Sequence, residues 1–205
     1  MLARIIKQDE KEPLSIEMLG RLVPSWCRVT FYDRLSRYKT LKAAMQGKTC
    51  MIVLYQIHTK KKTVKNQAGH FILINTVNKV EYFSSSGWSV SQELSETHSD
   101  PKIFHRLLGE NYIENRIPLE KFGDSNTCWR FCLARAVLSD LPLKDFQKLF
   151  SHHLVLENPD DIVTALTMLY TERVKKEIKK ILDKRYAPEK GRKEANRWRL
   201  QKNEN

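Results

Sequence analysis

Residues 69–87 read GHFILINTVNKVEYFSSSG and contain the pattern that decides the fold. Two apolar, β-branched runs, residues 70–77 and 79–83, meet at a polar turn, which predicts two antiparallel strands. The small polar residues 84–87 then predict a loop. Upstream, KTCMIVLYQIH at residues 48–58 is a third apolar run and predicts a strand buried on both faces. Together these segments predict a three-stranded antiparallel meander.

A helix is predicted to begin at or beside Cys128. The segment CWRFCLARAVL, residues 128–138, consists of helix formers, and each of the four preceding residues, DSNT, can cap a first turn. A short strand is predicted at residues 112–117. Apolar residues at three- and four-residue intervals predict further helices. These cover residues 14–23, 33–46, 100–108, 141–154 and 159–186.

The chain has 205 residues and a formal charge of +12, because 36 Lys and Arg outweigh 24 Asp and Glu. Its length fits one domain with a sizeable core. We expect residues 1–187 to form that domain and the basic residues 188–205 to form a mobile tail. No run approaches the roughly 20 apolar residues of a membrane helix, and the first residues lack the apolar core of a signal peptide. We therefore expect a soluble protein made in the cytosol.

The four cysteines are too few for a disulfide scaffold and are expected to be reduced. Cys128 and Cys132 form a C-x3-C pair with His152 and His153 downstream, whereas structural zinc sites usually use C-x2-C or H-x3-H pairs. Adjacent histidines in a helix or strand also point in different directions. We therefore expect no metal and no organic cofactor, and we expect Cys132 to pack in the core.

Cys128 has the position of a reactive thiol. At a helix N-terminus, unpaired N–H groups and the helix dipole favour negative charge, so the pKa of Cys128 is expected to be lowered. Its backbone N–H, free of an intrahelical partner, can point at the oxyanion of a tetrahedral intermediate. The thiolate needs an imidazole to protonate the leaving amine, and His70, directly after Gly69, is the best candidate. A third group that orients the imidazole is expected near the end of the neighbouring strand.

The segments GHFILI, VEYFSSSG and SNTCWRFCLARAV occur in this order at residues 69–74, 80–87 and 125–137. They resemble the histidine strand, the acidic-residue strand and the cysteine helix of the adenovirus protease (adenain) family. That family groups with ubiquitin-like-protein proteases and with maturation proteases of virophages and of Maverick or Polinton elements. The resemblance covers about residues 49–138. It implies an α+β fold with a papain-like, circularly permuted core, an antiparallel sheet packed against the nucleophile helix, and extra C-terminal helices.

By this resemblance, His70 takes the role of general base and Cys128 that of nucleophile. Phe131 and Cys132 match the apolar face of the nucleophile helix, and Gly87 matches a glycine in the turn after the acidic strand. The implied activity is that of a cysteine endopeptidase that cleaves viral capsid or other structural precursors during virion maturation. Such an enzyme would work in the virion and in the host cytoplasm or viral factory.

The sequence departs from the family pattern at two parts of the site. Ser84 stands where the family typically carries Asp or Glu, so the third catalytic member would be a neutral hydrogen-bonding group, with Glu81 as a fallback. The family's oxyanion-hole glutamine is also missing. Lys121, Ser125 or Asn126 would have to supply the donor beside the Cys128 backbone N–H.

A third departure is Trp129, which replaces a glycine and is expected to put bulk beside the path of the substrate backbone. These departures leave open a catalytically degenerate, DNA-binding virion protein of the same fold. A ubiquitin-like-modifier isopeptidase is a further alternative, although such enzymes usually present an acidic docking face. Here residues 171–205 carry 13 Lys and Arg against 6 Asp and Glu, and residues 60–65 read KKKTVK. Both segments are either solvated surface or a non-specific DNA contact.

Overall fold

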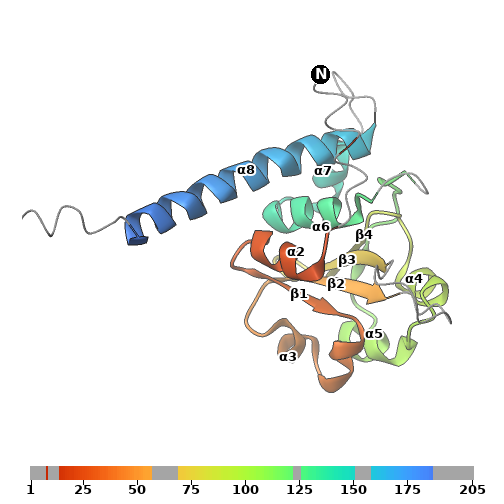
Figure 1. Cartoon of the computed structure of the whole chain (residues 1–205). Coiled ribbons are helices and arrows are strands. Elements are labelled where there is room, and N and C mark those ends of the chain that lie inside the picture. Colours follow the sequence, from red (N-terminus) through yellow and green to blue (C-terminus); the bar gives the residue numbers. More distant parts are fainter. Residues whose placement is uncertain (1–7, 9–13, 57–68, 122–125, 151–157, 187–205) are drawn as a thin grey trace, which may run out of the picture. The chain divides into compact units, whose positions relative to one another are not determined.

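The structure of the chain is a computed structural model (Figure 1). It describes residues 8, 14–56, 69–121, 126–150 and 158–186. The chain forms two compact units, Met1–Met168 and Leu169–Asn205, and each is described by itself. The proposed tail, the basic loop at residues 60–65 and the histidines at 152 and 153 lie outside the described residues. Within the described parts, none of the helices has the length and apolarity needed to cross a lipid bilayer.

A mixed five-stranded sheet forms the centre of the first unit, in the order β1-β2-β3-β4-β5. The strands are β1 (Cys27–Phe31), β2 (Cys50–Gln56), β3 (Gly69–Asn75), β4 (Glu81–Ser84) and β5 (Ile113–Glu114). The antiparallel meander of β2, β3 and β4 is confirmed. The prediction of a purely antiparallel sheet was wrong at both edges, because β1 pairs parallel to β2 and β5 pairs parallel to β4. Each parallel pair is joined by a helical crossover, as parallel pairing requires.

The helices follow the predicted segments with two differences. The segment expected as one helix over residues 33–46 forms two short elements, the 3₁₀ helix η1 and the helix α3. The helix α4 was not predicted. The described helical elements are α2 (Ile16–Leu22), η1 (Asp33–Arg37), α3 (Leu41–Met45), α4 (Val90–Glu96), α5 (Pro101–Leu108), α6 (Cys128–Val137), α7 (Leu143–Lys148) and α8 (Pro159–Tyr186).

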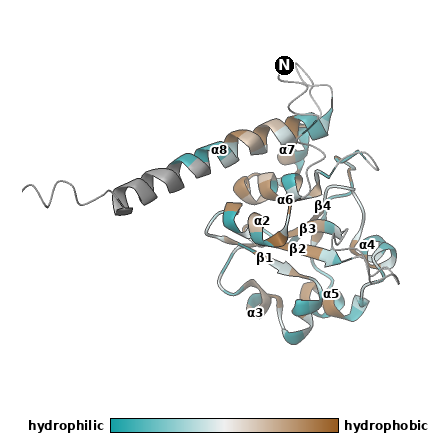
Figure 2. Ribbon diagram, in the orientation of Figure 1, coloured by the Kyte–Doolittle hydropathy of each residue, from teal (hydrophilic) through white to brown (hydrophobic). Residues whose placement is uncertain are grey.

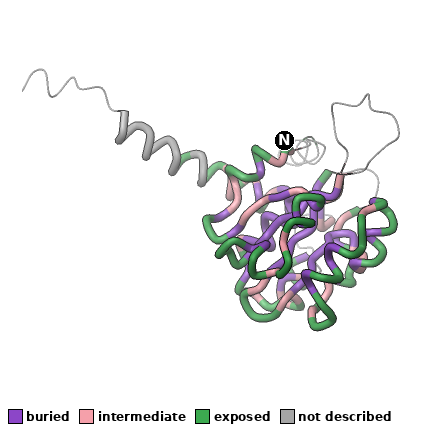
Figure 3. Tube along the Cα trace, turned by 90° about the horizontal axis from the view of Figure 1, so that it is seen from below, coloured by how far each residue is buried: buried purple, intermediate pink, exposed green. Residues whose placement is uncertain are grey.

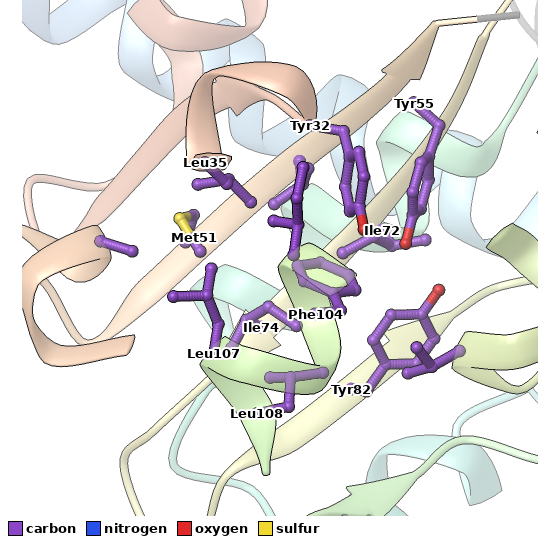
Figure 4. Close-up of a cluster of buried hydrophobic side chains, with 14 of the residues drawn as sticks. Tyr32, Leu35, Met51, Tyr55, Ile72, Ile74, Tyr82, Phe104, Leu107 and Leu108 are labelled. Carbon is purple, nitrogen blue, oxygen red and sulfur yellow. The ribbon is translucent and has the colours of Figure 1, made fainter. Parts of the chain in front are cut away.

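Both faces of the central strands are covered, which confirms that β2 is buried on both sides. Figure 1 shows α6 on one face of the sheet and α3 and α5 on the other. On the α5 face, the rings of Tyr32, Tyr55, Tyr82 and Phe104 pack together (Figure 4). The edge of Phe104 meets the Tyr32 ring at a centroid distance of 4.9 Å. Figure 3 shows the same layering, with buried stretches in the middle of the unit and exposed ones around them.

The helix α6 is fixed to the sheet by polar as well as apolar contacts, and much of its length is hydrophobic (Figure 2). Arg135 makes a bidentate ion pair with Glu81 of β4, at 2.7 Å from Nε and 2.8 Å from Nη2. The thiol of Cys132 is fully buried and donates to the carbonyl of Phe71 at 3.3 Å, which confirms its predicted place in the core. Glu81 is therefore part of the core, and its role as a fallback third catalytic member was wrong.

Candidate active site

His70 is the second residue of β3, at the end where this strand begins. It lies opposite Tyr55 of β2 in the antiparallel register. A side chain at the preceding Gly69 would place its Cβ 2.4 Å from the Tyr55 carbonyl oxygen and 2.7 Å from Leu54. Only glycine fits this close approach of the two strands. The sequence around His70 thus holds the imidazole at one end of the central strand, with 18% of its side-chain surface exposed.

The Nε2 atom of His70 meets a carboxylate that the sequence did not predict for this role. Glu93 of α4 is fully buried and places Oε1 3.3 Å from Nε2. Ser84 lies between them, with Oγ 3.2 Å from Nε2, and donates to Glu93 Oε1 at 2.5 Å. Ser86 Oγ is 3.5 Å from the same nitrogen. Ser84 thus lies beside the imidazole, where it was predicted to lie. The group that can orient the imidazole is, however, the pair of Ser84 and Glu93, and it is negatively charged when the Glu93 carboxyl is ionised.

Glu93 could have been found from a local signal. Ser89 and Gln92 form a capping box, whose sequence pattern marks the start of a helix at Val90. In that helix, Val90, Glu93 and Leu94 have the spacing of one buried face, and all three are buried. An acidic residue on the apolar face of a short helix next to the predicted active-site strand is a candidate functional group.

Cys128 is the first residue of α6, as predicted. Its Sγ, a ring nitrogen of His70 and a carboxylate oxygen of Glu120 all lie within 4.8 Å of one another. Because Nε2 faces Glu93 and Ser84, Nδ1 is the nitrogen available to the thiol. The structure therefore brings together the predicted nucleophile and the predicted base, and it adds Glu120, which the sequence did not single out.

Glu120 lies where an oxyanion would be bound. The backbone N–H groups of Cys128 and Thr127 act on its carboxylate, and the Ser85 hydroxyl donates to Oε2 at 2.7 Å. The Cys128 N–H is the oxyanion donor predicted from the helix N-terminus. In this structure that donor faces a carboxylate, so an oxyanion and the charged form of Glu120 compete for one N–H.

A second carboxylate fixes the chain on both sides of residues 122–125. Asp160, near the start of α8, accepts hydrogen bonds from the Lys121 backbone N–H at 3.0 Å and from the Thr127 hydroxyl. Asp160 is only 2% exposed. The first turn of α6 is therefore held from α8, because the Thr127 side chain, at the N-cap position, does not cap the helix itself.

The other residues proposed for the oxyanion hole are placed less favourably. The Lys121 side chain is exposed, and its backbone N–H is already engaged by Asp160. Asn126 is exposed, and Ser125 lies outside the described residues. The expectation for Trp129 was also wrong, because its ring is buried beneath the Arg130 guanidinium at 4.1 Å and adds little bulk to the surface.

The turn after β4 requires the glycine that the family resemblance singled out. Gly87 has a φ of +70°, a conformation that favours glycine. A Cβ on Gly87 would lie 2.6 Å from the backbone nitrogen of Pro118. This close packing brings the chain just before Glu120 against the loop that follows Ser84.

Burial controls the protonation of the thiol and the imidazole. It raises the pKa of Cys128, the Glu120 carboxylate raises it further, and the backbone N–H groups of Phe71 and Trp129 oppose the rise. Burial also lowers the pKa of His70 to about 4. The expected lowering of the Cys128 pKa was wrong, because lost hydration outweighs the helix N-terminus. The resting pair is a neutral thiol and a neutral imidazole.

The two glutamates of the site have similar protonation behaviour. Burial raises the pKa of Glu93 to about 7. The hydrogen bond from Ser84 lowers this pKa, and the charge of Glu120 raises it by a smaller amount. Burial likewise raises the pKa of Glu120 to about 7. The hydrogen bond from Ser85 lowers this pKa, and the charge of Asp160 raises it. Near neutral pH both carboxyls therefore change charge within the site.

We expect the melting temperature to fall as the pH rises from about 5 to about 7 and to level off above about 7.5. Between about pH 4.5 and 7 the folded protein keeps protons on Glu93 and Glu120 that the unfolded chain has released, so the free energy of unfolding falls with rising pH until both states are ionised. His70, whose pKa is lowered to about 4, has the opposite effect only below about pH 6.5. Thermal melts of Glu93→Gln should show a smaller fall, and the exposed-site control Glu110→Gln should match the wild type. An equal fall in Glu93→Gln would contradict this account.

Comparison with known proteins gives a relative in sequence and a likeness in structure. No family model matches the chain. The chain is similar to a virophage protein. Over 184 residues it is 22% identical to "Uncharacterized protein V9" of Sputnik virophage, which covers 80% of this chain and 98% of V9. Among solved structures, ChlaDub1 from Chlamydia trachomatis aligns with 13% identity and a TM-score of 0.36, over 85% of this chain and 78% of that chain.

These similarities do not establish the family to which the chain belongs. V9 is a virophage protein, and the chain spans nearly the whole of that relative. A TM-score of 0.36 is too low to establish a shared fold, so the ChlaDub1 likeness carries no further weight. Membership of the adenain family stays a prediction.

Proposed function

We propose that this protein is a cysteine peptidase. The observation that carries the proposal is the meeting of Cys128, His70 and Glu93 from α6, β3 and α4. A thiol at a helix N-terminus, an imidazole within reach of it and a buried carboxylate behind the imidazole are the parts that nucleophilic acyl transfer needs. In this arrangement Cys128 is the nucleophile, His70 is the base and Glu93 is the group that orients and stabilises the imidazole.

In the first step, Nδ1 of His70 takes the proton of the Cys128 thiol as sulfur attacks the substrate carbonyl carbon. The imidazolium that forms is stabilised by Glu93, whose Oε1 lies 3.3 Å from Nε2, and by Ser84. Because the resting pair is neutral, proton transfer accompanies attack. His70 then gives this proton to the leaving amine, and the acyl group stays on sulfur until water, deprotonated by His70, releases it.

The oxyanion of the tetrahedral intermediate needs the Cys128 backbone N–H. The protonated form of Glu120 can donate a second hydrogen bond to this oxygen, whereas the ionised form would repel it. Glu120 thereby takes the place that Lys121, Ser125 and Asn126 were expected to fill. Since the pKa of Glu120 is raised to about 7, the active form is present below neutral pH and declines above it.

For the substrate, we propose structural precursor proteins of a virus, cleaved during particle maturation. The similarity to the virophage protein V9 supports a viral setting, in the virion and in the host cytoplasm or viral factory. The charge of +12 fits an enzyme that works beside a nucleic acid genome, with non-specific DNA as a partner. The degenerate DNA-binding alternative loses one of its supports, because Glu93 supplies the carboxylate that Ser84 lacks.

The proposal is tested by co-expressing the chain with the structural proteins of its own virus and mapping new N-termini by mass spectrometry. Discrete cleavages in the wild type that vanish with Cys128→Ala would support it. Intact precursors in both cultures, together with hydrolysis of a C-terminal amide of ubiquitin or a related modifier, would favour the isopeptidase alternative. No thiol-dependent cleavage of either substrate would contradict the peptidase assignment.

A further inference from the structure

The atoms that meet at Cys128 also form a donor set for a metal ion. Cys128 Sγ, a nitrogen of His70 and an oxygen of Glu120 lie within 4.8 Å of one another and come from three separate parts of the chain. In a tetrahedral zinc site, with bonds of about 2.0 to 2.3 Å, such atoms are about 3.3 to 3.6 Å apart. Shifts of about 1 Å in these side chains would reach that geometry. We propose that Cys128, His70 and Glu120 bind Zn²⁺ and leave one coordination position open.

The surroundings of two ligands match those of protein zinc sites. A zinc-bound histidine usually donates its other N–H to a carboxylate, which fixes the ring and its tautomer. Here Nε2 of His70 faces Glu93 Oε1 at 3.3 Å, so Nδ1 is presented to the metal. A ligating carboxylate is itself usually hydrogen-bonded. Glu120 accepts from the Ser85 hydroxyl at 2.7 Å.

Charge balance favours a divalent ion at this position. Cys128 Sγ and a Glu120 carboxylate oxygen can each carry a negative charge, and they lie within 4.8 Å of one another. On binding, the thiol releases its proton, any proton on Glu120 is also released, and the two resulting negative charges offset those of Zn²⁺. The mixed sulfur, nitrogen and oxygen donors select zinc over magnesium and calcium, which prefer oxygen alone.

Zinc bound here would switch off the chemistry of the thiol. The metal would occupy the sulfur lone pair that attacks a carbonyl and the imidazole nitrogen that accepts the thiol proton. Cys128 would then be protected from alkylation, while the open position would hold water or a substrate group. The inference rests on the donor atoms and holds whether or not the chain is a peptidase.

The test uses the full-length, reduced, chelator-treated protein and titrates it with Co²⁺ as a spectroscopic probe. We expect one Co²⁺ per chain, a thiolate-to-cobalt charge-transfer band and intense visible bands of a four-coordinate ion. Zn²⁺ should displace the cobalt and should slow iodoacetamide labelling of Cys128. Cys128→Ser should lose the charge-transfer band, and Glu120→Gln should weaken Zn²⁺ binding by at least about tenfold. The exposed Glu110→Gln is the matched control and should bind as the wild type does.

Two results would overturn the site. A charge-transfer band that persists in Cys128→Ser would place the metal on another thiol, and unchanged Zn²⁺ affinity in Glu120→Gln would remove Glu120 from the ligands. Thermal melts of each variant verify that it is folded. Substrate cleavage without Co²⁺ binding would overturn the zinc site and leave the proposed function standing, whereas metal binding without any cleavage would do the reverse.

Discussion

Replacing Cys128 with serine is expected to lower kcat/KM for peptide-bond cleavage by about 10⁴-fold or more. The hydroxyl keeps the shape of the site but is a far weaker nucleophile than sulfur beside a neutral imidazole. His70→Ala should cause a loss of similar size, because the thiol would then have no base within reach. The double variant should be no slower than either single variant, since the two groups act as one unit. Initial rates on a mapped precursor peptide measure all three.

Cys132→Ala is the matched control, because Cys132 lies on the same helix, is fully buried and takes no part in the proposed chemistry. Its kcat/KM should stay close to that of the wild type. Retention of about a tenth of the wild-type rate in Cys128→Ser would show that another group carries the reaction. Additive losses in the double variant would show that Cys128 and His70 act independently.

The second large effect concerns stability. Arg135→Met should lower the free energy of unfolding by about 3 to 5 kcal/mol, because it leaves the Glu81 carboxylate buried without its partner. The side chains of Arg135 and Glu81 are only 1% and 4% exposed, and two hydrogen bonds of 2.7 and 2.8 Å join them. Urea unfolding followed by circular dichroism measures the change.

The surface pair of Arg116 and Glu114 provides the comparison. Its side chains are 56% and 21% exposed and lie 3.2 Å apart, so Arg116→Met should cost less than about 1 kcal/mol. The double variant Glu81→Leu with Arg135→Met should recover much of the lost stability, because neither charge is then buried alone. A double variant as unstable as Arg135→Met would show that packing of the arginine, rather than its charge, is what the core requires.

Much of the central fold could be predicted because it depends on local pattern. The strands β2, β3 and β4 are apolar runs separated by polar segments, and the start of α6 is marked by capping residues before Cys128. The resemblance to the adenain family, which rests on the order of the histidine, the serine loop and the cysteine, then predicted that His70, Ser84 and Cys128 share one site. The edge strand β5 falls within the short strand predicted at residues 112–117, whereas β1 was not predicted. The parallel pairing of both edge strands could not be predicted in this way, because it joins segments across long connections.

The charged groups of the site were missed for a different reason. Glu93 is buried and Glu120 is half-buried, whereas most glutamates in proteins lie on the surface. Glu93 accepts a hydrogen bond from Ser84 and Glu120 accepts one from Ser85. Both serines belong to the polar run 84–87 that was predicted to be a loop, and such tertiary contacts cannot be predicted from local pattern. The same burial raised the pKa of the Cys128 thiol, which reversed the expectation from its helix position alone.

The clamp formed by Asp160 gives the site an order of assembly during translation. Asp160 follows Thr127 by 33 residues, yet it holds both Thr127 and Lys121 at the base of the Cys128 helix. A nascent chain that has released α6 but not the start of α8 from the ribosome carries the thiol without this support. The growing polypeptide therefore gains these two hydrogen bonds beside the Cys128 helix only after Asp160 has emerged.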